Sequence, residues 1–139
     1  MTSKPDCIFC QIVAGRAPAA KIAETDHAIA FMDLFPVSDG HCLVIPKVHY
    51  DDVFGSDEAT LAQVHLLARR VARAIAKSLA PDGLMMTQLN GAAAGQTVFH
   101  YHAHLIPRRQ GSGLSLHGRR RADEAELAAI AARIGAAFE

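Results

Sequence analysis

The chain of 139 residues contains no tryptophan and has no excess of charge of either sign. Fourteen lysine and arginine residues balance fourteen aspartate and glutamate residues, so the formal net charge is zero. This balance argues against broad electrostatic binding of nucleic acid or of an anionic membrane, but a small anionic ligand held by local donors is compatible with it. The basic run "GRRR" at 118–121 is accordingly interpreted as a solvated loop.

Long apolar runs are also missing from the sequence. No segment approaches the about 20 apolar residues of a membrane-spanning helix. The N-terminal stretch "MTSKPDCIFCQIV" lacks the apolar region of a secretory signal. We therefore expect a cytoplasmic protein that has no membrane segment.

Cysteine is scarce, with three residues in the chain. Because a reducing compartment disfavours disulfides, Cys7 and Cys10 in "CIFC" are interpreted as a metal or redox pair. Cys42 lies in the apolar stretch "HCLVIP" and is interpreted as a small buried hydrophobe. Histidine is frequent by contrast, with eight residues, of which His27, His65 and His117 are expected at the surface or on a helix face.

The length predicts one domain, and the order of patterns predicts an α+β fold with a mostly antiparallel sheet. Apolar residues at helical spacing predict one long helix that is capped by Ser56 and stopped by "PDG" at 81–83. A second helix is expected at about 122–138. Strands are expected within 20–33 (two strands), 41–47, 84–89 and 97–107, and "GAAAG" at 91–95 is expected to be a flexible loop.

Three histidines stand on alternate positions in "GQTVFHYHAHLIPR". On a strand, His100, His102 and His104 would share one face, and the other face would be apolar enough to pack against a helix. Two chemical interpretations follow. All three imidazoles could bind one metal ion, as in three-histidine zinc sites, or one imidazole could act as a nucleophile that its neighbours support.

The segment before these histidines favours the nucleophile. Gly91 and Gly95 allow the backbone to turn and to approach a ligand, and backbone N–H groups in such a turn can form an anion-binding nest. Gln96 and Thr97 add side-chain donors. A phosphate held here implies phosphoryl chemistry, for which an imidazole with an ordinary pKa of about 6.5 is a competent nucleophile.

The run "HYHAHLI" resembles the signature of the histidine triad (HIT) superfamily, and the likeness continues in "AFMDLFPVSDGHCLVIPKVH", "NGAAAGQTVFH" and "LIPR". The resemblance implies a single HIT domain over 1–139, with a core at about 7–109. It also implies a five-stranded antiparallel sheet packed with helices, usually paired as a homodimer. Members of the superfamily are nucleotide-binding hydrolases or transferases that act at the α-phosphate of nucleoside 5′-phosphate derivatives.

The resemblance also implies roles for single residues. His102 is similar to the nucleophile, His104 to the phosphate-side histidine, and His41 to the histidine that helps to orient the nucleophile. Asp33 matches the acidic residue that binds the ribose hydroxyls. The remaining nucleotide contacts would be Phe31 and Leu34 beside the base and Asn90, Gln96 and Thr97 in the phosphate loop, where Leu89 stands in a place that is polar in many relatives.

Zinc-containing branches of the superfamily carry ligands at four positions that this sequence matches. The resemblance thus implies a zinc ion held by Cys7, Cys10, His49 and His100. Four protein ligands close a tetrahedral site, so this zinc would be structural and would leave no position open for substrate.

The implied reaction is attack by His102 on the α-phosphate to give a covalent nucleotidyl-histidine, which water then cleaves to release the nucleoside monophosphate. Phosphoramidates, with a purine as the base, are the favoured substrates. The alternatives are hydrolysis of diadenosine polyphosphates, nucleotidyl transfer, and nucleotide binding as a non-catalytic scaffold. A hydrolase that uses all three histidines on one catalytic metal ion would leave the cysteine pair idle.

Overall fold

The computed structural model describes residues 3–113 and 120–139; His117 and the first two residues of the "GRRR" run lie outside these ranges. A five-stranded sheet and three α-helices form the described part of the chain. The elements run in the order α1 (Ile8–Val13), β1 (Lys21–Glu24), β2 (Ala28–Met32), β3 (Cys42–Pro46), α2 (Glu58–Leu79), β4 (Gly83–Gln88), β5 (Ala103–Arg108) and α3 (Glu124–Ala136), with a 3₁₀-helix η1 (Ala92–Ala94) before β5.

The sheet has the strand order β1-β2-β3-β5-β4, and each neighbouring pair is antiparallel. Every residue of β2 and β3 is buried, since these strands are covered on both faces. In β5, His104 lies opposite Leu43 of β3 and opposite Thr87 of β4. The predicted α+β class with an antiparallel sheet is confirmed.

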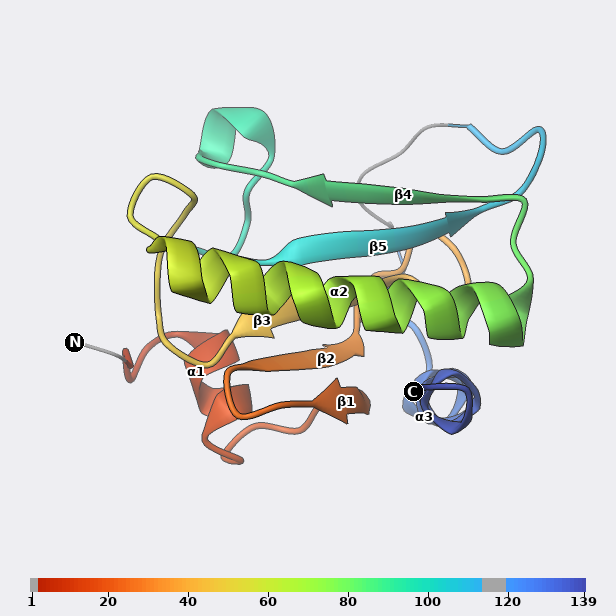
Figure 1. Cartoon of the computed structure of the whole chain (residues 1–139), viewed down its shortest axis with the longest axis horizontal. Coiled ribbons are helices and arrows are strands. Elements are labelled where there is room, and N and C mark those ends of the chain that lie inside the picture. Colours follow the sequence, from red (N-terminus) through yellow and green to blue (C-terminus); the bar gives the residue numbers. More distant parts are fainter. Residues whose placement is uncertain (1–2, 114–119) are drawn as a thin grey trace.

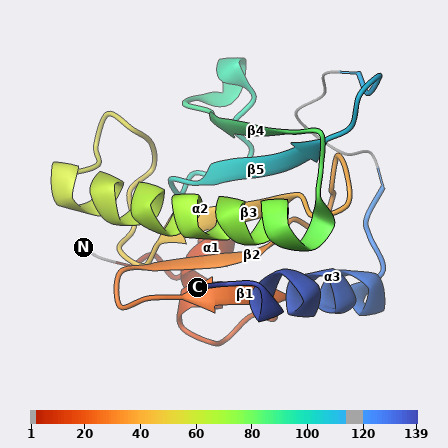
Figure 2. The ribbon, with the colours of Figure 1, turned by 45° about the vertical axis from the view of Figure 1, so that its right-hand side comes forward.

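The two faces of the sheet carry different layers (Figures 1 and 2). On one face, α2 and α3 pack against the alternate strand residues Ala28, Ala30 and Val44. On the other face, Phe9 of α1 packs with Ile29, Phe31, Leu43 and Ile45. Because neighbouring residues of a strand point to opposite faces, His104 and its partner Leu43 belong to the face that α1 partly covers.

The long helix α2 forms as its apolar spacing predicts, with Val64, Leu67, Val71 and Ile75 buried. The predicted cap is wrong by one residue. The carboxylate of Asp57 accepts a hydrogen bond from the Thr60 backbone N–H at 2.7 Å and so caps the helix. The hydroxyl of Ser56 instead donates to the carbonyl of Asp52 at 2.8 Å.

The last strand is shorter than predicted. It begins at Ala103, so His100 and His102 precede it rather than share it with His104. The segment 97–102 leaves the ladder because the Tyr101 backbone N–H donates to the Tyr50 carbonyl at 2.6 Å. The expected loop at 91–95 contains the short helix η1. In the described ranges, no helix is long and apolar enough to span a membrane.

Candidate functional site

Two cysteines and two histidines gather on the α1 side of the sheet, and we call them the Cys–His group: Cys7, Cys10, His49 and His100. The thiol of Cys7 lies 3.4 Å from Nδ1 of His100, and the thiol of Cys10 lies 3.3 Å from Nδ1 of His49. All four ligand atoms lie within 4.8 Å of one another. Residues that stand up to 93 positions apart thus meet with the donor set that zinc prefers.

Hydrogen bonds fix the tautomer of both histidines in this group. Nε2 of His100 lies 2.8 Å from the Pro46 carbonyl, and Nε2 of His49 lies 2.7 Å from the Asp51 carboxylate. Because both partners only accept, each Nε2 carries the proton and each Nδ1 directs its lone pair at the thiols. Burial lowers the pKa of His100 to about 4, so this imidazole is neutral at neutral pH.

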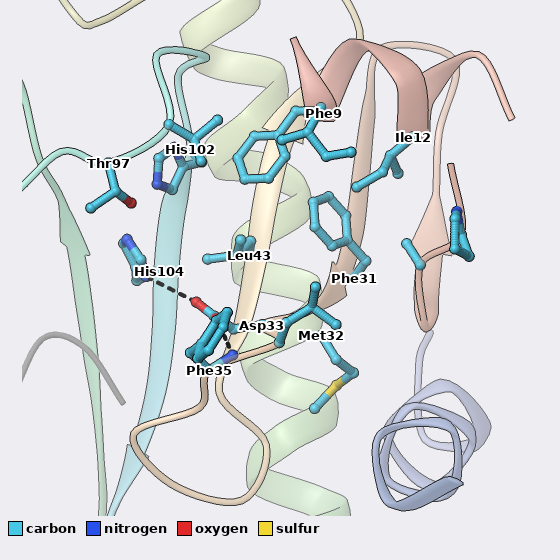
Figure 3. Close-up of a pocket in the computed structure, with 15 residues that line it drawn as sticks. Phe9, Ile12, Phe31, Met32, Asp33, Phe35, Leu43, Thr97, His102 and His104 are labelled. Atoms are coloured by element: carbon cyan, nitrogen blue, oxygen red, sulfur yellow. Dashed lines mark hydrogen bonds and ion pairs between the residues drawn. The ribbon is translucent and has the colours of Figure 1, made fainter. Parts of the chain in front are cut away.

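A pocket of about 440 Å³ opens beside this group, on the same face of the sheet. Figure 3 shows His102, His104 and Thr97 on one side of it and an apolar wall that includes Phe9, Ile12 and Phe31 on the other. The complete lining is Ile8, Phe9, Ile12, Pro18, Ala19, Phe31, Met32, Asp33, Leu34, Phe35, Leu43, Thr97, Val98, His102 and His104. Such a division suits a ligand with one flat apolar part and one polar part.

His102 presents an unprotonated nitrogen toward this pocket. Its Nδ1 lies 2.7 Å from the backbone carbonyl of His100, which only accepts hydrogen bonds. Nδ1 therefore carries the proton of the neutral imidazole, and Nε2 keeps its lone pair. The ring also meets the edge of Phe9, with centroids 5.2 Å apart at 90°. This arrangement holds the imidazole of His102 in one tautomer and one orientation.

A second pair of histidines has a different arrangement of protons. The Val37 backbone N–H donates to Nδ1 of His41 at 2.9 Å, so the proton of His41 is on Nε2. That nitrogen lies 3.0 Å from Nδ1 of His104 and 3.3 Å from Oδ2 of Asp33. Nδ1 of His104 thus faces a donor and keeps its lone pair, which places the proton of neutral His104 on Nε2. We call Asp33, His41 and His104 the relay group.

The ligand atoms of the relay group also lie within 4.8 Å of one another, but their protons do not suit a metal. A metal bound to Nε2 of His41 would move its proton to Nδ1, where it would oppose the Val37 N–H. The resemblance to the superfamily assigns His41 to the orientation of the nucleophile. In the structure, Nε2 of His41 lies 3.0 Å from Nδ1 of His104, and the part of His41 in orienting the nucleophile stays a prediction.

The predicted contacts for ribose and base lie at the pocket, since Asp33, Leu34 and Phe31 all line it. Phe31 is buried, whereas Leu34 is 42% exposed and stands at the rim. Asp33 also has a local role, because its Oδ1 accepts the Phe35 backbone N–H at 2.8 Å. One oxygen of Asp33 can therefore support the turn before Pro36, while the other faces Nε2 of His41.

The predicted phosphate-loop residues divide into two kinds. Thr97 lines the pocket, but Asn90 and Gln96 are not among its lining residues. The side chain of Gln96 is buried, accepts from the Gly91 N–H at 2.7 Å and donates to the Asp51 carbonyl at 2.6 Å. Asn90 accepts from the Val53 N–H at 2.8 Å. Both amides hold the loop, whose glycines Gly91 and Gly95 have φ of +91° and +99°.

Sequence reasoning missed the wall that α1 adds to the pocket, which consists of Ile8, Phe9 and Ile12. The available signal was the apolar content of "IFCQIV" directly around the cysteine pair. It also missed Asp51 as the partner of His49. Asp51 lies two positions after His49, and a carboxylate that close to a histidine ligand is a common supporting contact.

The comparisons with known proteins agree with this geometry. The HIT domain family model matches residues 14–111, and the chain belongs to this family. An uncharacterised HIT-like protein of Mycoplasma genitalium is 50% identical over 102 residues, which are 73% of this chain and 72% of that protein. Adenylylsulfatase HINT3 of Arabidopsis thaliana is 38% identical over 109 residues, which are 78% of this chain and 55% of that protein.

Solved structures of HIT proteins share the whole fold. A HIT-like protein of Bartonella henselae has a TM-score of 0.92 and 34% identity, with 99% of this chain and 100% of that chain covered. A zinc-bound histidine triad protein of Mycobacterium smegmatis has a TM-score of 0.84 and 38% identity over 95% of this chain and 92% of its own. Membership of the family supports a nucleotide-binding protein with hydrolase-type or transferase-type activity in general.

Proposed function

We propose that the protein hydrolyses nucleoside 5′-phosphate derivatives at the α-phosphate through a covalent nucleotidyl-histidine on His102. The observation that carries this proposal is the arrangement of protons in the pocket. Nε2 of His102 carries the electron pair of the imidazole because Nδ1 bears the proton and hydrogen bonds to the His100 carbonyl. The neighbouring His104, with ring centroids 4.9 Å away, is an N–H donor on Nε2 because of the relay group.

The reaction then has two displacements at phosphorus. The electron pair of Nε2 forms the N–P bond while the bond from phosphorus to the leaving group breaks, and the leaving group departs with its electron pair. Water attacks in the second step, the N–P bond breaks, and its electrons return to Nε2. The proton of the water goes to the solvent. Donation by His104 and Thr97 would stabilise the charge on the phosphoryl oxygens, and Asp33 would accept from the ribose hydroxyls.

The leaving group distinguishes the candidate substrates. An amine that leaves a phosphoramidate must gain a proton, whereas a sulfate or a nucleotide leaves as a stable anion. We place phosphoramidates first. The likeness to the adenylylsulfatase of Arabidopsis thaliana favours a second candidate, a mixed anhydride of a nucleoside monophosphate and sulfate. Hydrolysis of dinucleoside polyphosphates and nucleotidyl transfer stay as predicted alternatives, and so does binding without turnover.

The Cys–His group would hold a structural zinc ion. Its donor set, its lone pairs and the zinc-bound relative of Mycobacterium smegmatis support this assignment. When bound, zinc supplies charge that keeps the two thiols ionised and free energy that stabilises the fold. All four ligands come from the protein, so the reaction steps belong to the pocket. Pairing as a homodimer and a cytoplasmic location stay predictions.

Replacement of His102 tests the function directly. His102→Ala should lower turnover of a nucleoside phosphoramidate by at least about 10³-fold, because the nucleophile is gone. It should still bind the nucleoside monophosphate, since ribose and base contacts come from other residues. Wild-type protein quenched in base should carry a nucleotidyl mass adduct that the variant lacks. A panel with adenosine 5′-phosphosulfate and diadenosine polyphosphate ranks the substrates, and wild-type turnover by the variant would refute the mechanism.

A further inference from the structure

The helix α1 belongs to both the Cys–His group and the pocket. Cys7 caps this helix, with its sulfur accepting from the Cys10 N–H, and Cys10 lies inside the helix. Between and after these cysteines, Ile8, Phe9 and Ile12 line the pocket. The residues that would hold a metal therefore alternate with residues that would contact the base of a nucleotide.

Phe9 is the main contact between the two sites. It is buried, and its ring meets Phe31 at 5.4 Å and His102 at 5.2 Å between centroids. The same ring lies 5.8 Å from that of His100 in the Cys–His group. His100 adds a second connection, since its carbonyl accepts the Nδ1–H of His102. Movement of α1 would change the apolar wall and the surroundings of the nucleophile together.

Local structure alone does not hold this helix. It has six residues, and an isolated helix shorter than about 12 residues is marginal in water. Ile8 is 50% exposed, and the apolar packing of α1 on the sheet comes from buried Phe9 with partly buried Ile12 and Val13 beside it. The proposed ribose and phosphate contacts come from β5, the loop before it and the turn after β2. That loop also carries His100, but His100 keeps its hydrogen bond to the Pro46 carbonyl when no metal is bound. Loss of the metal contacts at Cys7 and Cys10 would thus disturb the apolar wall for the base more than the polar side of the pocket.

We propose that metal occupancy of the Cys–His group sets the base-dependent part of nucleotide affinity through α1. This inference rests on the proposed function for its ligand class. In the metal-bound protein, Phe9 and Ile12 form a fixed wall for the base. In the metal-free protein, α1 loses two of its attachments and the wall loosens, while Asp33, Thr97 and His104 still hold ribose and phosphate. Because coupling between two sites is reciprocal, a bound base should also strengthen metal retention.

The test compares two ligands on zinc-loaded and chelator-stripped protein by NMR titration. Adenosine 5′-monophosphate carries the base, and ribose 5-phosphate lacks it. Removal of zinc should weaken the binding of adenosine 5′-monophosphate by about tenfold, which is within the usual range of coupling between sites. It should change the binding of ribose 5-phosphate by less than about twofold. Amide hydrogen exchange over 8–13 should become faster. Equal losses for the two ligands, or no loss for either, would overturn the proposal.

Two variants distinguish a specific effect on the apolar wall from general damage to the protein when zinc is removed. Phe9→Ala should keep its zinc but should bind adenosine 5′-monophosphate weakly. Removal of zinc from this variant should then lower that affinity only a little further. Leu34→Ala, which changes the pocket outside α1, should lose affinity yet keep the full effect of stripping. An undiminished effect of stripping in Phe9→Ala would contradict coupling through α1.

A measurement on the loaded protein covers the case in which stripped protein unfolds. Adenosine 5′-monophosphate should slow the loss of zinc to a competing chelator, because its base would contact α1 and α1 must open before Cys7 and Cys10 release the metal. Ribose 5-phosphate, which has no base, should not slow it, and loss at equal rates with both ligands would overturn the proposal. Failure of the loaded protein to bind adenosine 5′-monophosphate at all would refute the proposed function instead, so the two failures are distinguishable.

Discussion

The Cys–His group and the relay group each contain two buried histidines, yet their protons are arranged in opposite ways. In the Cys–His group, both imidazoles donate outward, to the Pro46 carbonyl and the Asp51 carboxylate, and direct lone pairs at each other and at the thiols. In the relay group, an imidazole N–H of His41 faces the lone pair of His104. The first arrangement suits a cation at its centre, whereas in the second a proton lies between the two imidazoles.

The hydrogen-bond partner of one ring nitrogen of a histidine decides whether the other ring nitrogen donates an electron pair or a proton. A carbonyl or carboxylate partner makes the opposite nitrogen an electron-pair donor, as in His49, His100 and His102. A backbone N–H partner, as on His41, makes the opposite nitrogen a proton donor. We therefore expect different roles for the three alternating imidazoles of the sequence, although they belong to one short segment.

The largest expected effect comes from breaking the Cys–His group. Cys10→Ser should lose bound zinc and lower the free energy of unfolding by about 4 kcal/mol or more, because metal binding and folding are coupled. Metal content by mass spectrometry and denaturant unfolding measure both effects. Cys42→Ala is the matched control, since Cys42 is fully buried in the core and belongs to neither group; it should keep its zinc.

Breaking the relay group should affect turnover and leave the metal in place. His104→Ala removes the proposed donor to the phosphoryl oxygens and should lower kcat by about 10²–10³-fold, as loss of one such donor does. His104→Gln should recover part of this loss, because its amide N–H can replace the Nε2–H. Steady-state kinetics beside a zinc assay checks the prediction. Loss of zinc from either variant would show that the two groups are not separate.

The smallest effect concerns Asp33, which belongs to the relay group and lines the pocket. Asp33→Asn keeps an oxygen for the Phe35 N–H but loses the charge that would accept from two ribose hydroxyls. Binding of a ribonucleoside monophosphate should weaken by about 1.5–3 kcal/mol, and binding of the 2′-deoxy analogue should weaken less. Calorimetry with both sugars checks this. Equal losses would restrict Asp33 to its role in the turn.

Much of this arrangement could be predicted because its signals are local. Apolar runs identified β2 and β3, and apolar residues at helical spacing identified α2. The resemblance to zinc-containing HIT proteins identified the four members of the Cys–His group. The start of β5 could not be predicted, since it depends on the hydrogen bond from Tyr101 to the distant Tyr50 carbonyl. The direction of the His41 hydrogen bond depends likewise on tertiary contacts with Val37 and His104.

The contacts of single residues in the site also depend on tertiary structure that local sequence signals do not predict. The resemblance implied that Asn90 and Gln96 belong to the phosphate loop. In the structure their amides hold backbone groups of the loop and of 51–53, and a contact with phosphate stays a prediction. The wall from α1 was missed because apolar residues next to a cysteine pair indicate packing as readily as ligand binding. Which side a six-residue helix covers is decided by the sheet on which it packs.

The positions of the imidazole protons test the central claim most directly. A long-range ¹H–¹⁵N correlation spectrum of the zinc-loaded protein, assigned with single histidine variants, reports which nitrogen of each ring is protonated. The account predicts Nδ1–H for His102 and Nε2–H for His41, His49, His100 and His104. A spectrum with His102 protonated on Nε2 and His104 on Nδ1 would contradict it, because the pocket would then contain neither the nucleophile nor the donor.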